Sequence, residues 1–218
     1  MDLLPSIIAG AAGLAVGWTL GGYQHLLYRQ PEYRARPAQG RRLLALRLFL
    51  GAAMGVTGAV ALRPGHYETG PALLALGFAW VLCVLSSTDL ERRIIPNRLT
   101  YPAIAAAALL AWAWPDRSLG ASLAGGSIGL VVGAALFAVG VFFARGGAFG
   151  LGDVKLMLLS GLLVGWPGVL NAVLIGVVAA GLPGLVLTLA GRGKMYFAYG
   201  PYLSLGALLV LLFPGIFT

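Results

Sequence analysis

Charged residues are scarce in this 218-residue chain, at 10% of the sequence, whereas hydrophobic residues make up 59%. A water-soluble domain has about a quarter of its residues charged, so this chain cannot cover a water-exposed surface in that way. The apolar residues form repeated runs near the ~20 residues that a helix needs to cross a bilayer. Because the runs lack the two-residue alternation of membrane strands, we predict an all-α, polytopic transmembrane bundle.

Cysteine and histidine are almost absent as well. The single cysteine, Cys83, stands in an apolar run, which excludes an intrachain disulfide framework and predicts a small buried residue. The only histidines, His25 and His66, fall on opposite sides of the predicted membrane and cannot form a metal site together. Neither histidine stands beside a serine that could act as a nucleophile. We therefore expect no metal and no cofactor, and exclude a zinc protease.

Proline, glycine and charge clusters divide the chain into eight predicted helices. Their approximate bounds are residues 3–22, 43–62, 71–88, 99–114, 121–144, 151–165, 168–190 and 200–217. The first run has no basic residue before it, so we interpret it as an uncleaved span with its N-terminus outside. No stretch is long enough for a separate soluble domain, and we expect residues 1–218 to form one membrane-embedded domain.

Basic residues are distributed unevenly between the predicted loops. Threading the spans from an outside N-terminus places four segments on one side, namely residues 29–42, 89–98, 145–155 and 191–199. All 15 lysines and arginines except Arg63 and Arg117 belong to that side, which the positive-inside rule makes cytoplasmic. Their dispersal over short loops, without interleaved aromatic residues, argues against nucleic-acid binding.

Glycine recurs every four residues in three of the predicted helices. The series are Gly13, Gly17 and Gly21, then Gly51 and Gly55, then Gly125, Gly129 and Gly133. Ridges of small residues let helices approach closely. We favour packing within one bundle over a dimer interface, and a homo-oligomer is left open.

Two of the seven acidic residues stand at the ends of apolar runs. Asp89 closes the third predicted helix and Asp153 opens the sixth, so both are expected at the cytoplasmic edge. Two neighbouring carboxyl groups share one proton, and the charged member can then activate water while the neutral member donates to a substrate carbonyl. Gly150 and Gly152, just before Asp153, would let a substrate backbone come close and would allow unusual dihedral angles.

Each of these residues also has an ordinary interpretation. Asp153 stands where a helix N-cap would be, and Asp89 could be a solvated residue of a charged loop. We interpret Glu91 as a solvated loop residue, and we expect Lys155 to extend to the membrane interface. A proton-coupled transporter that uses Asp89 and Asp153 as a relay is the main alternative function, although it would place acids nearer the bilayer midplane.

Three segments resemble motifs of the prepilin peptidases, which are type IV leader peptidases of the GxGD group of membrane aspartyl proteases. They are Asp89 followed by Arg-Arg-Ile-Ile-Pro-Asn-Arg-Leu-Thr at 92–100, Gly-Leu-Gly-Asp-Val-Lys-Leu at 150–156, and Phe-Ala-Tyr-Gly-Pro-Tyr-Leu-Ser-Leu-Gly at 197–206. The resemblance spans roughly residues 71–217. Presenilin-like proteases also share Gly-x-Gly-Asp, but in them a Pro-Ala-Leu segment follows the aspartate, whereas residues 71–73 precede both acids here.

The resemblance implies that Asp89 and Asp153 are the catalytic pair of an endopeptidase. Its substrates would be prepilin or pseudopilin precursors, cut after their short basic leader at the cytoplasmic face of a prokaryotic inner membrane. Membrane lipid would be the other partner. The residues expected to support the site or the substrate are Gly150, Gly152, Lys155, Pro96 and Asn97.

The sequence departs from the family pattern in two places. The closing motif of the family has proline where Ala198 or Tyr199 stands here. Many bacterial members also carry a cysteine-bearing region, linked to N-methylation of the product, in their first cytoplasmic loop. The corresponding loop, residues 29–42, is short and contains no cysteine, so we expect the methyltransferase region to be missing.

Overall fold

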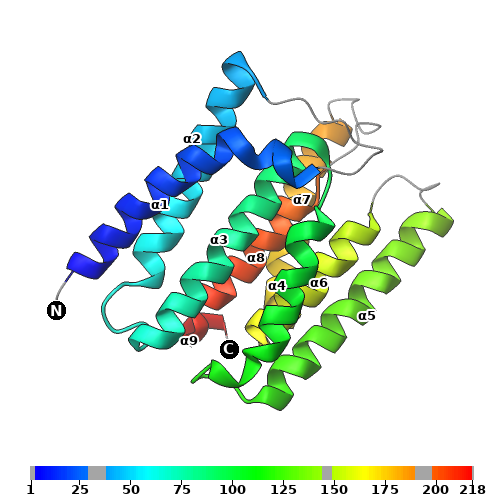
Figure 1. Cartoon of the computed structure of the whole chain (residues 1–218). Helices are drawn as coiled ribbons and strands as arrows, with labels where there is room; N and C mark the ends of the chain where they lie inside the picture. Colours follow the sequence, from blue (N-terminus) through cyan, green and yellow to red (C-terminus); the bar gives the residue numbers. More distant parts are fainter. Residues whose placement is uncertain (1–2, 29–37, 144–148, 190–197, 218) are drawn as a thin grey trace. The chain divides into compact units, whose positions relative to one another are not determined.

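The computed structural model describes residues 3–28, 38–143, 149–189 and 198–217, and these ranges contain helices and turns but no strand. The chain divides into two compact units, Met1–Arg92 and Arg93–Thr218, and each is described here by itself. The prediction of an all-α helix bundle is confirmed (Figure 1).

Unit 1 contains three long helices that run alternately in opposite directions. They are α1 (Leu4–Tyr23), which continues into the 3₁₀ turn η1 (Gln24–Tyr28), α2 (Gly40–Ala61) and α3 (Thr69–Arg92). At one end of the unit, Ser6 Oγ at the start of α1 donates to the carbonyl of Leu62, just after α2, at 3.0 Å. At the other end, the side chain of Gln24 meets that of Glu91 in the last turn of α3.

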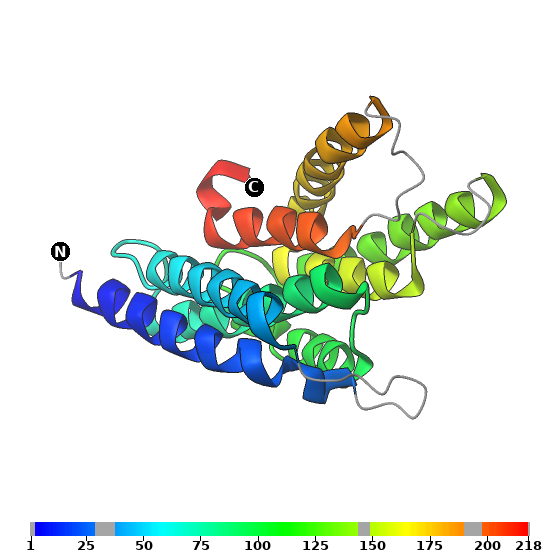
Figure 2. The same ribbon diagram turned by 90° about the horizontal axis from the view of Figure 1, so that it is seen from above.

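Glycine allows α1 and α2 to lie backbone against backbone. A Cβ atom at Gly13 would lie 2.2 Å from the carbonyl oxygen of Met54, and one at Gly17 would lie 2.3 Å from that of Leu50. Both views show the two helices side by side along their length (Figures 1 and 2). The predicted role of the glycine series in packing within the chain is confirmed for this helix pair.

In unit 2, other helices pack around the short helix α6. Its elements are α4 (Asn97–Leu109), the 3₁₀ turn η2 (Ala111–Ala113), α5 (Leu119–Phe143), α6 (Leu151–Val164), α7 (Gly168–Leu189), α8 (Gly200–Leu212) and α9 (Pro214–Phe217). Helix α6 packs against α4, α5, α7 and α8, and most of its side chains are buried. A Cβ atom at Gly161 of α6 would lie 2.1 Å from the carbonyl oxygen of Gly125 in α5, so the glycine series of α5 also serves packing within the chain.

Four helices of the described ranges are long and apolar enough to cross a membrane: α1 with η1, α2, α3 and α5. Helices α7 and α8 contain shorter apolar stretches. Helix α6 has 14 residues and rises about 21 Å at 1.5 Å per residue, which is less than the thickness of a bilayer core. Helices α1 to α8 follow the eight predicted segments in order, and the number that cross the bilayer stays a prediction.

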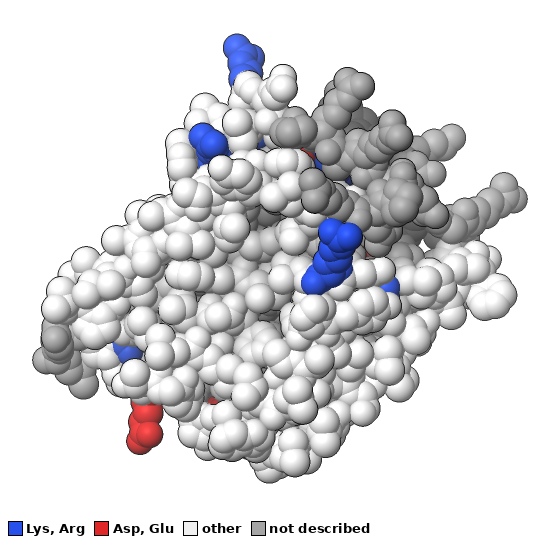
Figure 3. Space-filling view, in the orientation of Figure 1, with Lys and Arg blue, Asp and Glu red and all other residues white. Residues whose placement is uncertain are grey.

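The surface is suited to contact with lipid. Large apolar side chains such as Ile7, Leu14, Val131 and Leu174 are more than half exposed. On the face shown in Figure 3, the charged side chains of the described residues occupy only a few small patches. These features are those of a multi-pass membrane protein.

Parts of the predicted cytoplasmic loops lie outside the described residues, namely 29–37, 144–148 and 190–197. The predicted loop at 89–98 is described throughout. Its first residues are helical, because α3 continues to Arg92, and α4 begins at Asn97. Cys83 is buried in α3, as predicted.

Candidate active site

Asp89 lies in the last turn of α3 and is 5% exposed. Three buried polar residues, Ser86, Ser87 and Thr88, precede it, and the hydroxyl groups of two of them bond to carbonyls one turn back. Ser86 Oγ donates to Leu82 O at 2.8 Å, and Thr88 Oγ1 donates to Leu85 O at 2.9 Å. Asp89 is therefore a buried helical residue, and its interpretation as a solvated loop residue is wrong.

The connection from α3 to α4 is short, and two features of its backbone stand out. Arg93, directly after α3, has a φ of 55°, a left-handed conformation that glycine usually supplies at this position. Pro96 is the N-cap of α4, and its carbonyl accepts the backbone N–H groups of Leu99 and Thr100 at 3.1 and 3.0 Å. The predicted Pro96-Asn97 turn is thus the start of α4, which begins six residues after Glu91.

A set of polar side chains, the Glu91 cluster, lies at the same end of unit 1 as Asp89. It consists of Glu91, Gln24, Tyr28, Arg42 and Arg92. Gln24 Nε2 and Tyr28 Oη donate to Glu91 Oε2 at 2.5 and 3.3 Å. Arg42 Nη2 and Arg92 Nε each lie 3.4 Å from Glu91 Oε1. The Glu91 side chain is only 2% exposed, so the prediction that water solvates it is wrong.

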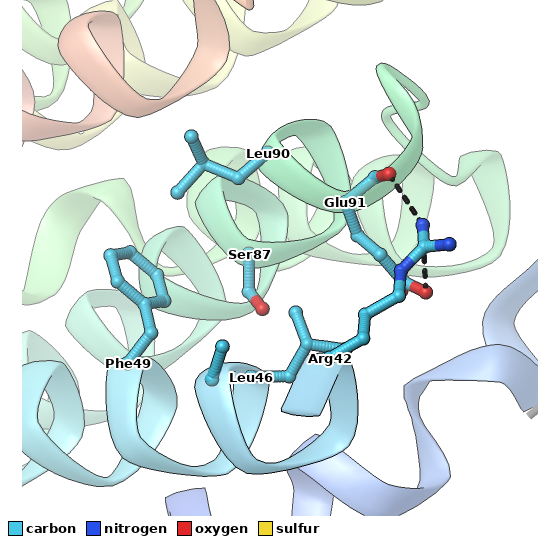
Figure 4. Close-up of a pocket in the computed structure, with 7 residues that line it drawn as sticks. Arg42, Leu46, Phe49, Ser87, Leu90 and Glu91 are labelled. Carbon is cyan, nitrogen blue, oxygen red and sulfur yellow. Dashed lines mark hydrogen bonds and ion pairs between the residues drawn. The ribbon is translucent and has the colours of Figure 1, made fainter. Parts of the chain in front are cut away.

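A groove of about 380 Å³ lies beside the Glu91 cluster, between α2 and α3. Figure 4 shows Arg42 reaching from α2 toward the end of α3, where dashed lines join its guanidinium group to Glu91. The rest of the lining is mostly apolar and includes Leu46, Phe49 and Leu90. The charged cluster therefore closes one end of a groove that is otherwise suited to apolar groups.

Asp153 lies in the first turn of α6 and is 8% exposed. The N-cap of this helix is Gly150, so the interpretation of Asp153 as the N-cap is wrong by three positions. Asp153 Oδ2 instead accepts the backbone N–H of Gly150 at 2.9 Å, as the third residue of a capping box does. The first turn of a helix favours a negative charge, because its N–H groups point outward without helical partners.

The two glycines before Asp153 differ in what they allow. Gly150 has φ −106° and ψ 162°, which any residue can adopt, so the predicted need for unusual dihedral angles there is wrong. Gly152 is required by close packing within unit 2, since a Cβ atom there would lie 3.1 Å from Cβ of Ile95. The absence of a side chain at Gly152 thus lets α6 approach the segment that leads into α4.

Lys155 connects α6 to α4. Its Nζ atom donates to Asn97 Oδ1 at 2.8 Å and lies 4.9 Å from the centre of the Tyr101 ring. The extension of Lys155 to the membrane interface stays a prediction, and its ammonium group has partners within unit 2. The structure brings Lys155 and Asn97 into direct contact, a pairing that was not predicted from the sequence.

The closing motif meets the segment that carries Asp153. The ring of Tyr199, the N-cap of α8, packs edge-on against the ring of Phe149 with 5.8 Å between centroids. Phe149 directly precedes Gly150 in the chain. The motif lacks the usual proline, and a ring-to-ring contact leaves no local sequence signal, so this contact was not predicted.

Basic residues of each unit gather at the end that carries its aspartate. In unit 1 they are Arg41 and Arg42 at the start of α2 and Arg92 at the end of α3, whereas Arg63 lies at the opposite end. In unit 2 Arg98 and Lys155 stand at the starts of α4 and α6, whereas Arg117 donates to Leu163 O at the end of α6. Within the described ranges, no three His, Cys, Asp or Glu side chains come together as metal ligands would.

Comparison with known proteins identifies a protein family that matches the chain. The model of the type IV leader peptidase family matches residues 76–185, a segment that includes most of α3, all of α4, α5 and α6, and most of α7. No solved structure matches the chain.

Three bacterial relatives are all named prepilin leader peptidase/N-methyltransferase. The protein of Burkholderia pseudomallei strain 1026b is 32% identical over 152 residues, covering 66% of this chain and 48% of the relative. The protein of Aeromonas hydrophila is 28% identical over 165 residues, with coverage of 75% and 56%. That of Pectobacterium carotovorum is 29% identical over 150 residues, with coverage of 66% and 51%. The matched segment thus spans about half the length of each relative.

Proposed function

The chain belongs to the type IV leader peptidase family, and from that premise we propose that it is a membrane aspartyl endopeptidase that removes the short basic leader from prepilin-like precursors. The observation that carries this proposal is that the matched segment, residues 76–185, contains both Asp89 and Asp153. The precursors and the surrounding lipid are its proposed partners. The match to peptidases gives no support to the transporter alternative.

The positions of the two aspartates at opposite kinds of helix end support different roles for them. Asp153 lies in the first turn of α6 and accepts the N–H of Gly150, which stabilises an ionised carboxylate. Asp89 lies in the last turn of α3, where unpaired carbonyl groups disfavour a further negative charge. We assign the role of general base to Asp153 and that of proton donor to Asp89.

These roles give a complete reaction for one peptide bond. Asp153 accepts a proton from water as the water oxygen attacks the carbonyl carbon, and Asp89 donates its proton to the carbonyl oxygen. When the resulting diol collapses, Asp153 gives its proton to the departing nitrogen and Asp89 recovers a proton from a diol hydroxyl. The products are a leader with a new carboxyl group and a mature protein with a new amino terminus.

We place the reaction at the cytoplasmic face. The sorting of basic residues to the aspartate-bearing end of each unit supports this orientation, because basic residues are retained on the cytoplasmic side during insertion. In a Cys83→Ala background, an impermeant thiol reagent added outside should label Asp116→Cys but not Arg34→Cys. Strong external labelling at position 34 would contradict the orientation.

Reconstitution with candidate precursors tests the activity itself. The purified full-length chain, in lipid with a pilin or pseudopilin precursor, should release the leader, and Asp89→Asn or Asp153→Asn should prevent the release. Mass spectrometry of the product should show an unmodified amino terminus, because the first cytoplasmic loop is short and lacks cysteine. An intact precursor would contradict the proposed cleavage. A methyl group added by the purified enzyme with S-adenosylmethionine would contradict only the missing methyltransferase function.

A further inference from the structure

The Glu91 cluster holds a buried carboxylate two positions after Asp89. The Glu91 side chain is 2% exposed and lies between the guanidinium groups of Arg42 and Arg92. A buried charge is tolerated only when it is paired and hydrogen-bonded, so removal of the Glu91 charge abolishes the two ion pairs that hold this carboxylate. A side chain so enclosed also has almost no surface with which to touch a substrate.

The same residues form hydrogen bonds with backbone and side-chain groups on both sides of Asp89 in the sequence. Tyr28 Oη donates to the carbonyl of Thr88 at 3.3 Å, and Arg42 Nη2 donates to the carbonyl of Glu91 at 2.8 Å. The carbonyl of Glu91 is among the last four of α3, and these carbonyls accept no hydrogen bond from an N–H group of the same helix. Ser87 Oγ donates to Gln24 Oε1 at 2.9 Å, and the amide of Gln24 in turn binds Glu91. The last turn of α3 is thus held by η1 and by α2.

We propose that Glu91 is a positioning residue for Asp89, acting with Gln24, Tyr28 and Arg42 to fix the turn of α3 from which the Asp89 carboxyl group projects. This inference rests on the proposed function, in which Asp89 donates a proton during peptide cleavage. A displacement of about 1 Å in a reacting group costs on the order of a hundredfold in rate, so a donor at a helix end needs such support. Gln24, Tyr28 and Arg42 all precede residue 76, so η1 and α2 contribute to the site from outside the segment that the family model matches.

The kinetic test is Glu91→Gln in the full-length chain reconstituted with a cleaved precursor. Because Glu91 acts through Asp89 and has no surface for substrate, kcat should fall at least tenfold while KM changes by less than about twofold. Glu68→Gln is the matched control: Glu68 is an exposed acid just before α3, at the opposite end of unit 1, and its change should leave both constants unchanged. The double change Gln24→Glu with Glu91→Gln exchanges amide and carboxylate between two bonded side chains, and it should restore part of kcat.

A second readout does not depend on cleavage. In a Cys83→Ala background, the thiol of Asp89→Cys should react slowly with a small maleimide, because residue 89 is 5% exposed in a fixed turn. Adding Glu91→Gln should raise the labelling rate at least tenfold, whereas adding Glu68→Gln should not. If the wild-type chain cleaves no precursor but labelling responds in this way, the proposed function fails while the positioning of residue 89 stands. If cleavage requires Asp89 but Glu91→Gln leaves either kcat or the labelling rate unchanged, the positioning role is overturned.

Discussion

The end of unit 1 that carries Asp89 and the end of unit 2 that carries Asp153 are held in place by different means. Asp89 closes the 24-residue helix α3 beside a buried ionic cluster whose members come from η1, α2 and α3. Asp153 opens the 14-residue helix α6, where Gly152 fits against Ile95 and a single lysine–amide bond reaches α4. The surroundings of Asp89 depend on long polar side chains that reach Glu91, whereas those of Asp153 depend on the absence of a side chain at Gly152.

This difference predicts which kind of substitution each unit tolerates. Neutralising a charge should damage the surroundings of Asp89 more than those of Asp153, since the carboxylate of Glu91 is buried against two arginines. Enlarging a small residue should damage the surroundings of Asp153 more, because α6 is enclosed by four helices at close range. The predictions below address that contrast, from the largest expected effect to the smallest.

The largest effect should come from the aspartates themselves. Asp89→Asn and Asp153→Asn should each lower cleavage by about a thousandfold or more, and the double change should be scarcely worse, because residues that act as one unit lose activity non-additively. A precursor cleavage assay on the purified variants measures this. Asp116→Asn, in the loop before α5, is the matched control and should cleave normally. Additive losses in the double variant would show that the two units contribute independently.

The next effect concerns the core of unit 2. Gly161→Ala would place a Cβ atom 2.1 Å from Gly125 O, so α5 and α6 must separate, and the free energy of unfolding should fall by about 3 kcal/mol. Unfolding by denaturant in detergent micelles, followed by circular dichroism, measures the change. Gly181→Ala in α7 is the control, because a Cβ atom there meets nothing within 4 Å. Equal stabilities of the two variants would refute the close approach of α5 to α6.

Gly152 and Gly150 should differ from each other in a smaller but measurable way. Gly152→Ala pushes against Ile95 and should lower kcat/KM about tenfold by shifting the first turn of α6. Gly150→Ala makes only ordinary contacts, at 3.6 Å with Asp153 Oδ2 and 3.9 Å with Gly152 N, in a conformation open to any residue, so its loss should be smaller. Side-by-side kinetics would settle the order. The reverse order would mean that Gly150 serves substrate approach more than Gly152 serves packing.

The smallest effect should come from the link between α4 and α6. Lys155→Met keeps most of the side-chain length but loses the bond to Asn97, and we expect a cost of about 1 kcal/mol in the free energy of unfolding. The same denaturant assay measures it. Asn97→Ala should cost a similar amount, and combining both changes should add little, since each removes the same bond. Full additivity would indicate separate roles for the two residues.

The helices could be predicted from the sequence because their boundaries are marked locally. Proline and glycine flank α6 and α8, and charge follows α1 and α3, so the expected order of segments agrees with α1 to α8. The glycine series likewise predicted close helix pairs, because a four-residue repeat places small residues on one helix face.

The environment of Glu91 could not be predicted from the sequence. Its neighbours in the chain are charged, which suggests a solvated loop, whereas the residues that bury it come from another part of unit 1. Gln24 and Tyr28 stand 67 and 63 positions earlier, and no periodicity connects them to Glu91. The bond of Lys155 was not predicted for the same reason, since its partner Asn97 is 58 positions away. Polar pairing across a fold leaves no local pattern, unlike apolar periodicity.

The close pairing of α1 with α2 has a consequence for how the protein is made. Synthesis proceeds from the N-terminus, so Gln24, Tyr28 and Arg42 leave the ribosome well before Glu91 does. Glycines such as Gly13 and Gly17 allow α1 and α2 to pair as a hairpin on entering the bilayer. The last turn of α3 can then pack against residues that were synthesised before it, and these residues hold the turn that carries Asp89.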